Sequence, residues 1–271
     1  LAVLDVVCSL AKTAMENNYC KPQFVEEKVI QLRNSRHPVV EILESKFVAN
    51  DIVMGQGEMM IVTGANMSGK STMQRQVALI ILMAQLGSFV PADEAVLGIT
   101  DRIFTRVGAS DDLVSGQSTF MVEMNETASI LNNATENSLI ILDEIGRGTS
   151  TFDGVSIAWS VAEHIYNQIK AKTLFSTHYH VMNKLEEKFT KIKNYYLVAK
   201  EVRGEIVFLY KLMAGGSDQS FGVHVAKLAG LPSEVISRAE EIQRILEKDD
   251  EMVGKIKAKK LQEQMILKNF K

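Results

Sequence analysis

The pattern of hydrophobic and polar positions divides the chain into alternating strand-like and helix-like segments. Continuous or short apolar runs predict strands at 47–51, 51–55, 59–64, 138–142 and 173–176. Helical periodicity predicts helices at 68–87, 119–134 and 155–169. Strands that are apolar throughout and alternate with helices are typical of a parallel sheet covered on both faces. The pattern therefore predicts an α/β layered fold with a largely parallel sheet.

The two ends of the chain carry different patterns. Residues 1–17 read as a helix, and residues 195–212 alternate with period two around Arg203-Gly204, which predicts a β-hairpin. Two helices are predicted at 223–230 and 233–247, followed by a lysine-rich tail. We expect four parts: a remnant helix of a preceding domain, a main domain, a two-helix element and a charged tail. Their expected ranges are 1–28, 29–214, 215–250 and 251–271.

Composition narrows the class of protein. The 271 residues are 46% hydrophobic and 23% charged, the ordinary balance of a globular protein. The net charge of −3 lacks the basic surplus with which a domain usually grips duplex DNA by itself. No secretory signal or membrane-length apolar run is visible. Cys8 and Cys20 lack metal-ligand spacing, which favours two free thiols in a reducing compartment. Because the chain starts at Leu1, we expect a fragment of a longer protein.

Residues 64–71 match the phosphate-loop pattern G-x-x-x-x-G-K-[ST] between a predicted strand and a predicted helix. Glycines let backbone N–H groups converge on phosphates, and the helix N-terminus adds positive potential. Lys70 is expected to neutralise the β- and γ-phosphate oxygens, and the Ser71 hydroxyl to ligate Mg²⁺. The expected nucleotide-binding residues here are Gly64, Ala65, Asn66, Met67, Ser68, Gly69, Lys70, Ser71 and Thr72.

Two carboxylates follow the predicted strand at 138–142, and a histidine follows the next strand. Asp143 is the expected Mg²⁺ ligand, and Glu144 the expected general base for an attacking water. Alternatively, the pair only caps the next segment. His178 ends the sequence TLFSTH and could contact the γ-phosphate, although a lone histidine is more often structural.

The segment SGQST, residues 115–119, runs into the helix predicted at 119–134. Ser118 stands where a helix N-cap belongs, with Met121, Met124, Ala128 and Leu131 forming one expected apolar stripe behind it. The chemistry suits either a plain capping serine or an anion site at the helix N-terminus. The residues alone leave both interpretations open.

Taken together, these segments closely resemble the C-terminal ATPase domain of the MutS family of DNA mismatch-repair proteins, within the ABC-ATPase superfamily. The resemblance covers residues 30 to 247. It rests on TGANMSGKST, ASDDLVSGQSTFMVEM, LDEIGRGTSTFDG and FSTHYH, which occur in the family's order and approximate spacing. The family usually has proline where Ala65 stands, on the outer bend of the loop, and we expect little consequence.

The resemblance implies roles for individual residues. In ABC-type ATPases the nucleotide lies between two subunits, so Ser118 looks like the residue that completes the neighbour's ATP site. The loop 146–154 resembles the segment that crosses the dimer. His178 matches the family's switch histidine, Asn66 a phosphate-loop asparagine, and Phe47 the aromatic that stacks on adenine. The helices at 215–250 resemble a helix-turn-helix element that docks onto the partner subunit.

The resemblance also implies cofactors and partners. It implies ATP or ADP with Mg²⁺, a homodimer or MutS-type heterodimer through the ATPase face, mismatched DNA held by domains outside this chain, and a downstream MutL-type repair factor. The expected location is the bacterial cytoplasm or a eukaryotic nucleus, with no membrane partner. The expected function is ATP hydrolysis that couples nucleotide state to movement of a DNA clamp.

Other functions remain as alternatives. A MutS relative acting in recombination would differ only in domains outside this chain. Another ABC-type ATPase, such as a transporter subunit, would carry LSGGQ, from which VSGQSTFMVE departs. A phosphate-loop kinase would consume ATP only in the presence of an acceptor for the γ-phosphate.

Overall fold

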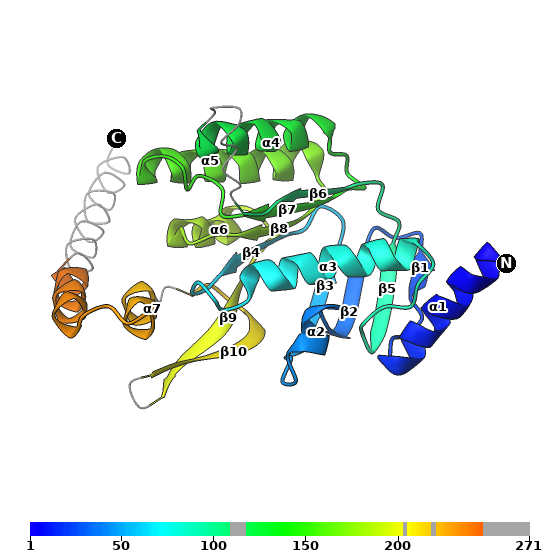
Figure 1. The fold of residues 1–271 in the computed structure, drawn as a ribbon. Helices are drawn as coiled ribbons and strands as arrows, with labels where there is room; N and C mark the ends of the chain where they lie inside the picture. Colours follow the sequence, from blue (N-terminus) through cyan, green and yellow to red (C-terminus); the bar gives the residue numbers. More distant parts are fainter. Residues whose placement is uncertain (109–117, 203–204, 218–220, 246–271) are drawn as a thin grey trace, which may run out of the picture. The chain divides into compact units, whose positions relative to one another are not determined.

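The computed structural model describes residues 1–108, 118–202, 205–217 and 221–245. The chain divides into two compact units between residues 219 and 220 (Figure 1). The hairpin turn expected at 203–204, part of the loop at 215–222 and the tail from 246 onward lie outside the described residues.

The first unit is built around a six-stranded sheet in the order β10-β9-β4-β8-β7-β6. Its strands are β4 (Met59–Thr63), β6 (Ile103–Arg106), β7 (Leu139–Asp143), β8 (Lys172–Ser176), β9 (Ile192–Val202) and β10 (Glu205–Ala214). Every neighbouring pair is parallel except β9 and β10, which form the expected antiparallel hairpin. Strand β4 is buried at every position, as its apolar sequence predicts, and β8 is also fully buried although its sequence KTLFS includes three polar residues. The expectation of an α/β fold with a largely parallel sheet is confirmed for this sheet.

A second, four-stranded sheet has the order β1-β5-β2-β3. Its strands are β1 (Gln23–Val25), β2 (Ile30–Ser35), β3 (Asn50–Met54) and β5 (Glu94–Gly98). Its pairings are antiparallel apart from β1 with β5. The prediction of strand at 47–51 is wrong for its first three residues, because β3 begins only at Asn50 and residues 47–49 are irregular. Residues 40–43, for which no element was predicted, form the short helix α2 (Val40–Leu43).

Helix α3 (Lys70–Gln85) lies between the two sheets (Figure 1). Its buried residues pack with those of both sheets in one apolar core, which includes Val77, Ile80, Ile52 and Leu139. The opposite face of the six-stranded sheet is covered by α4 (Thr119–Asn133), α5 (Thr151–His164) and the π-helical turn η1 (Ile165–Ile169). The short segments η2 (His180–Lys184) and α6 (Leu185–Lys188) complete this second core.

Two helix expectations need correction. The helix predicted at 155–169 begins at Thr151, because the Ser150 hydroxyl accepts a hydrogen bond from Asp153 N and so caps an earlier first turn. Of the stripe predicted on α4, Met124 and Leu131 are partly buried and pack against the second core, whereas Met121 is 52% exposed and Ala128 is also exposed. The fully buried positions of α4 are Glu123, Thr127 and Ile130.

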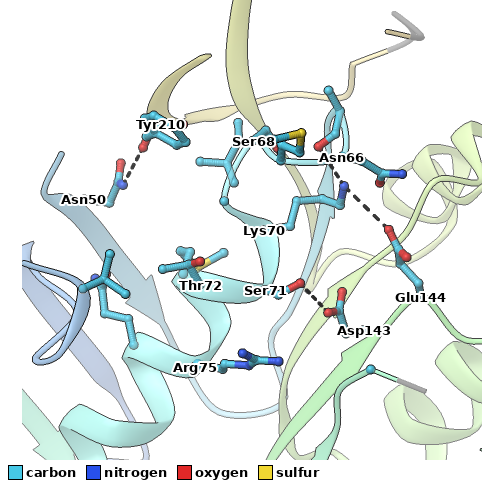
Figure 2. A pocket seen from close by; sticks show the side chains of 18 of the residues that line it. Asn50, Asn66, Ser68, Lys70, Ser71, Thr72, Arg75, Asp143, Glu144 and Tyr210 are labelled. Carbon is cyan, nitrogen blue, oxygen red and sulfur yellow. Dashed lines mark hydrogen bonds and ion pairs between the residues drawn. The ribbon is translucent and has the colours of Figure 1, made fainter. Parts of the chain in front are cut away.

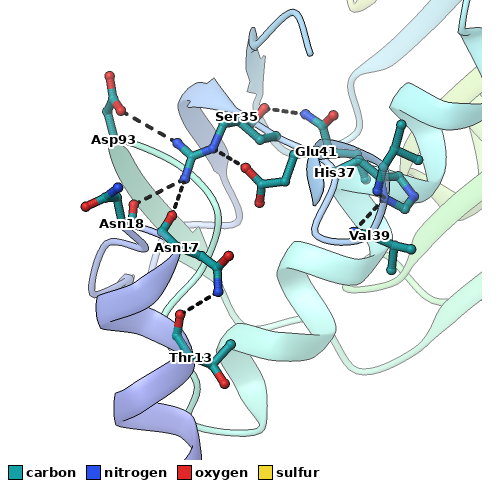
Figure 3. Close-up of polar contacts among 11 residues, drawn as sticks. Thr13, Asn17, Asn18, Ser35, His37, Val39, Glu41 and Asp93 are labelled. Atoms are coloured by element: carbon teal, nitrogen blue, oxygen red, sulfur yellow. Dashed lines mark hydrogen bonds and ion pairs between the residues drawn. The ribbon is translucent and has the colours of Figure 1, made fainter. Parts of the chain in front are cut away.

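Helix α1 (Ala2–Glu16) leaves most of its apolar side chains exposed, with only Ala14 buried. Arg36 ties the end of this helix to the four-stranded sheet. Its guanidinium donates to the carbonyls of Asn17 and Asn18 at 3.1 and 3.2 Å, and Nε donates to Glu41 Oε2 at 2.6 Å (Figure 3). Cys8 and Cys20 are both free thiols.

The second unit is described for α7 (Gly222–Leu228) and for a further helical segment at 233–245. Gly230, at φ +85°, and Pro232 separate the two helices. Within the described residues of the whole chain, no helix combines the length and the apolar character that crossing a bilayer requires.

Candidate nucleotide-binding site

The predicted phosphate loop joins the end of β4 to the start of α3, as its motif requires. Gly69 stands immediately before α3 with φ +97°, a conformation that side chains strongly disfavour, which explains the glycine. The loop borders a cavity of about 650 Å³ (Figure 2). Of the predicted nucleotide-binding loop residues, all but Gly64 line it. Ser68 is 1% exposed, and its Oγ has no hydrogen-bond partner among the described residues, so the loop retains an unsatisfied polar atom suited to a ligand.

Lys70 is almost fully buried, with 5% of its side chain exposed. Its ammonium donates to the carbonyls of Gly64 at 2.8 Å and Ala65 at 3.1 Å, and lies 3.7 Å from Glu144 Oε1. Burial lowers the pKa of Lys70, and the nearby carboxylates of Glu144 and Asp143 oppose that shift. The cation is therefore held at the loop by weak acceptors that a phosphate could replace.

Asp143 and Ser71 meet at the carboxyl end of β7. The Ser71 hydroxyl donates to Asp143 Oδ2 at 2.5 Å (Figure 2). The Ser176 hydroxyl donates to Oδ1 of the same carboxylate. A hydroxyl and a carboxylate are oxygen ligands of the kind that Mg²⁺ prefers, and Mg²⁺ commonly uses one or two protein oxygens together with substrate phosphates. The residues present fit Mg²⁺.

Glu144 follows β7 with a left-handed backbone, φ +58°. Its own N–H donates to the Ser176 carbonyl at 3.0 Å, which fixes that unusual conformation. The carboxylate is 10% exposed and pairs with Arg147 Nη2 at 2.5 Å as well as with Lys70. Glu144 thus faces the cavity with its negative charge balanced by two cations.

His178 lies just beyond the end of β8, two residues after Ser176. Its ring packs against Tyr179, with centroids 4.1 Å apart. Burial by surrounding protein lowers the pKa of His178, and the nearby cations Arg147 and Lys70 lower it further, while Glu144 opposes the shift. The histidine is therefore within electrostatic reach of Lys70 and Glu144, although it does not line the cavity.

Two aromatic residues line the same cavity. Phe47, predicted as a base-stacking residue, lines it from the irregular segment before β3. Tyr210 lines the same cavity from β10 and was not predicted, because only the tertiary structure brings residue 210 to the loop. The ring of Tyr210 lies so close to the loop that a Cβ added at Gly69 would be 3.3 Å from its Cδ1.

Ser118 is not brought into this cavity. It is exposed, and its Oγ accepts from Met121 N at 3.2 Å, so it is the N-cap of α4. Residues 109–117, which contain most of the signature-like segment, lie outside the described residues. The cap interpretation of Ser118 is confirmed, and its contribution to a partner's site stays a prediction.

Two further cavity residues were missed from the sequence, Arg106 and Glu123. Both are buried, at 6% and 4% exposure. Glu123 Oε1 accepts from Gly146 N at 2.5 Å, and Oε2 lies 3.6 Å from Arg106 Nη2. Glu123 therefore joins α4 to the backbone two residues beyond Glu144. A lone acidic residue within a helical pattern gave no signal for this contact.

Known proteins resemble the chain closely. A family model described as MutS domain V matches residues 60–247. The DNA mismatch repair protein MutS of Thermodesulfovibrio yellowstonii is 55% identical over 270 residues, which are 96% of this chain and 32% of that protein. The protein of the same name from Clostridioides difficile is 58% identical over 253 residues, 92% of this chain and 27% of the relative. The chain thus spans about a third of the length of such relatives.

Proposed function

The chain belongs to the MutS family and carries its domain V, and from this premise we propose that it binds ATP with Mg²⁺ and hydrolyses it. One observation carries the proposal. Lys70 and Ser71 of the phosphate loop share a cavity with Asp143 and Glu144 at the end of β7, and Ser71 is bonded directly to Asp143. A protein that only bound the nucleotide with Mg²⁺ would not need Glu144 beside the metal aspartate, whereas hydrolysis needs such a carboxylate.

Each residue has a role that follows from its place. The loop N–H groups and Lys70 would bind the phosphates, and the aromatic rings of Phe47 and Tyr210, which line the same cavity, would hold the base. Ser71 and Asp143 would hold Mg²⁺. When bound, that ion supplies charge neutralisation at the phosphate oxygens.

Glu144 is the proposed general base. Its carboxylate is buried enough to exclude most water, and its backbone is fixed by Ser176, so it is oriented before a substrate arrives. To accept a proton from water, the carboxylate must exchange its contact with Arg147 or Lys70 for that water. A phosphate that attracts Lys70 would help to release it.

We further propose that two copies complete each other's sites. Ser118 lies outside the cavity of its own chain, at the exposed N-terminus of α4. A helix N-terminus carries positive potential that suits a phosphate of a second copy. Phe152, at the start of α5, is 88% exposed, which agrees with a partner-facing loop at 146–154. The element at 215–250 is proposed to dock onto the partner.

For the whole protein, the names of the relatives favour mismatch repair over recombination. We propose that its mismatched-DNA contacts and its MutL-type partner involve regions beyond this chain, and that it acts in the cytoplasm or nucleus. Nucleotide closure of the dimer would then move those regions.

The test uses the intact protein with Mg²⁺. Calorimetric titration with a non-hydrolysable ATP analogue and a phosphate-release assay should show binding and turnover. Lys70→Met should abolish both, whereas Lys200→Met, at an exposed lysine of β9, should change neither. Absence of triphosphate binding by the wild type would refute the proposal.

A further inference from the structure

Strand β10 carries an irregularity at the cavity. Phe208 pairs with Ala199 and Leu212 with Leu197, so residues 209–211 stand opposite the single residue Val198 of β9. Such a bulge interrupts the ladder and leaves backbone groups in need of other partners. Tyr210, in the middle of it, has φ +52°, a conformation that a bulky residue holds only when its surroundings enforce it.

The side chain of Asn50 provides those partners. Its Nδ2 donates to the Tyr210 carbonyl at 2.9 Å (Figure 2). Its Oδ1 accepts from Leu212 N at 2.8 Å. The side-chain amide offers both a donor and an acceptor, so it replaces the peptide group that a neighbouring strand would have offered, and Nδ2 also donates to the Val48 carbonyl at 3.3 Å. Lys211 Nζ adds a bond to the Ala49 carbonyl at 2.9 Å.

Asn50 is itself fixed to the helix that follows the phosphate loop. Asn50 is only 4% exposed. Its backbone carbonyl accepts a hydrogen bond from the Ser35 hydroxyl at 2.6 Å. Ser35 Oγ in turn accepts from Gln76 Nε2 of α3 at 2.7 Å (Figure 3). A continuous chain of hydrogen bonds thus runs from α3 through β2 and β3 to Tyr210. Buried bonds of this kind hold geometry firmly because their loss leaves polar groups unsatisfied.

We infer that Asn50 is a positioning residue for recognition of the nucleotide base, acting through the β10 bulge that places Tyr210 beside the phosphate loop. The inference rests on the proposed nucleotide function. Asn50 is the first residue of β3, only three residues after Phe47. One short segment therefore carries Phe47, which lines the cavity, and also holds the backbone of Tyr210, which lines it too. The phosphate loop, by contrast, has no hydrogen bond to the Asn50 side chain among the described residues.

Loss of Asn50 should weaken binding of the nucleotide base but not binding of the phosphates. Without Asn50, the Tyr210 carbonyl and Leu212 N–H lose their partners, and the bulge is free to adopt other conformations. Affinity for an ATP analogue should fall about tenfold, the scale of one lost base-stacking contact. Affinity for inorganic tripolyphosphate, which has no base, should stay unchanged. A merely structural role would weaken both ligands alike.

The experiment titrates the intact protein, with Mg²⁺, against a non-hydrolysable ATP analogue and against tripolyphosphate. The variants are Asn50→Ala, Asn50→Asp, Tyr210→Ala and the double variant Asn50→Ala with Tyr210→Ala. Asn50→Asp is nearly isosteric and keeps the acceptor for Leu212 N while removing the donor to Tyr210, so it serves if the alanine variant does not fold. Asn132→Ala is the matched control, since Asn132 is exposed on α4 and bonds only within its helix.

The expected result is an analogue-specific loss in both Asn50 variants that disappears when Tyr210 is already alanine, because the two residues then act as one unit. Equal loss for both ligands, no loss for either, or a full additional loss in the Tyr210→Ala background would each overturn the inference. A wild type that binds neither ligand would instead show that the proposed nucleotide function is wrong. If the wild type bound tripolyphosphate but not the analogue, the proposed base site would be wrong and the proposed phosphate site would stand.

Discussion

The hydroxyl of Ser71 donates a 2.5 Å hydrogen bond to Oδ2 of Asp143, which joins the first turn of α3 to the end of β7. The two residues are 72 positions apart in the sequence. Gln74 strengthens the same junction, because its Nε2 donates to the Leu142 carbonyl at 3.3 Å. The proposed Mg²⁺ ligands are therefore held together by the protein itself, and an ion would replace a hydrogen bond rather than gather distant groups.

Glu144→Gln should keep ATP binding and lower turnover. The amide preserves the size of the side chain but cannot accept a proton from water, and the hydrogen bond from the backbone N–H of residue 144 to the Ser176 carbonyl does not involve the side chain. We expect turnover to fall about a thousandfold, a typical loss for a general base. Single-turnover hydrolysis and calorimetric binding measure the two effects. Glu187→Gln, at an exposed glutamate of α6, is the control. Unchanged turnover in Glu144→Gln would remove Glu144 from the mechanism.

Ser118→Ala should have two separable effects. Loss of the cap on Met121 N should lower the free energy of unfolding by about 1 kcal/mol. ATP-driven association should weaken, while binding at the chain's own loop stays the same. Ser118→Gly should destabilise the helix less, because glycine is tolerated at N-caps, yet should weaken association equally. Sedimentation with an ATP analogue measures association, and isotherms identical to wild type would contradict the partner-site role.

Glu123→Ala should destabilise the protein strongly. Arg106 is buried, and removal of Glu123 also leaves Gly146 N without its acceptor. Breaking a buried charge pair on one side should cost about 3 kcal/mol of unfolding free energy. Glu126→Ala is the matched control: its carboxylate lies 3.0 Å from Arg106 Nε but is 48% exposed, so the loss should stay below about 1 kcal/mol. Denaturant titration measures both, and equal losses would refute the distinction.

The imidazole of His178 should remain neutral at pH 6.5. Burial and neighbouring cations lower its pKa, so below pH 6.5 the unfolded chain takes up a proton that the folded chain resists. Stability contributed by this group therefore falls as pH drops through that window and is intact above it. An NMR titration of the His178 ring should give a midpoint below 6.5. In Glu144→Gln the midpoint should fall further, because the carboxylate that raises the pKa is gone.

Lys172→Met should stabilise the protein at neutral pH. Lys172 is fully buried in β8, and its Nζ has no hydrogen-bond partner among the residues that the structure describes. Burial lowers its pKa, assisted by Lys28. An apolar side chain of similar length removes the desolvation cost, and we expect a gain of about 2 kcal/mol in unfolding free energy. Lys200→Met, on the exposed side of β9, should change stability by less than about 0.5 kcal/mol. A loss in Lys172→Met would mean that the amine is satisfied by water.

The sequence was most informative where the signal is local. The buried strands β4 and β7 are nearly continuous apolar runs, and the phosphate loop and the pair Asp143-Glu144 lie at their carboxyl ends. Such features can be predicted from a short stretch of sequence, because a motif and its strand lie within a few residues of each other.

What the sequence missed depends on distant partners. Tyr210 reaches the cavity through a bulge held by Asn50, 160 residues away. Helix α2 forms although its first residue is β-branched, because His37 Nδ1 accepts from Val39 N and Val40 N at 3.2 Å and caps the turn. The four-stranded sheet was only partly predicted, since β2 and β5 alternate buried and exposed residues over short lengths.

The cavity takes its walls from both sheets, with Asn50 from β3 and Asp143 from β7. A ligand that fills it would contact both sheets and so connect two layers that otherwise pack together through α3. Occupancy would therefore slow amide exchange in the smaller sheet as well, at backbone positions that no phosphate touches.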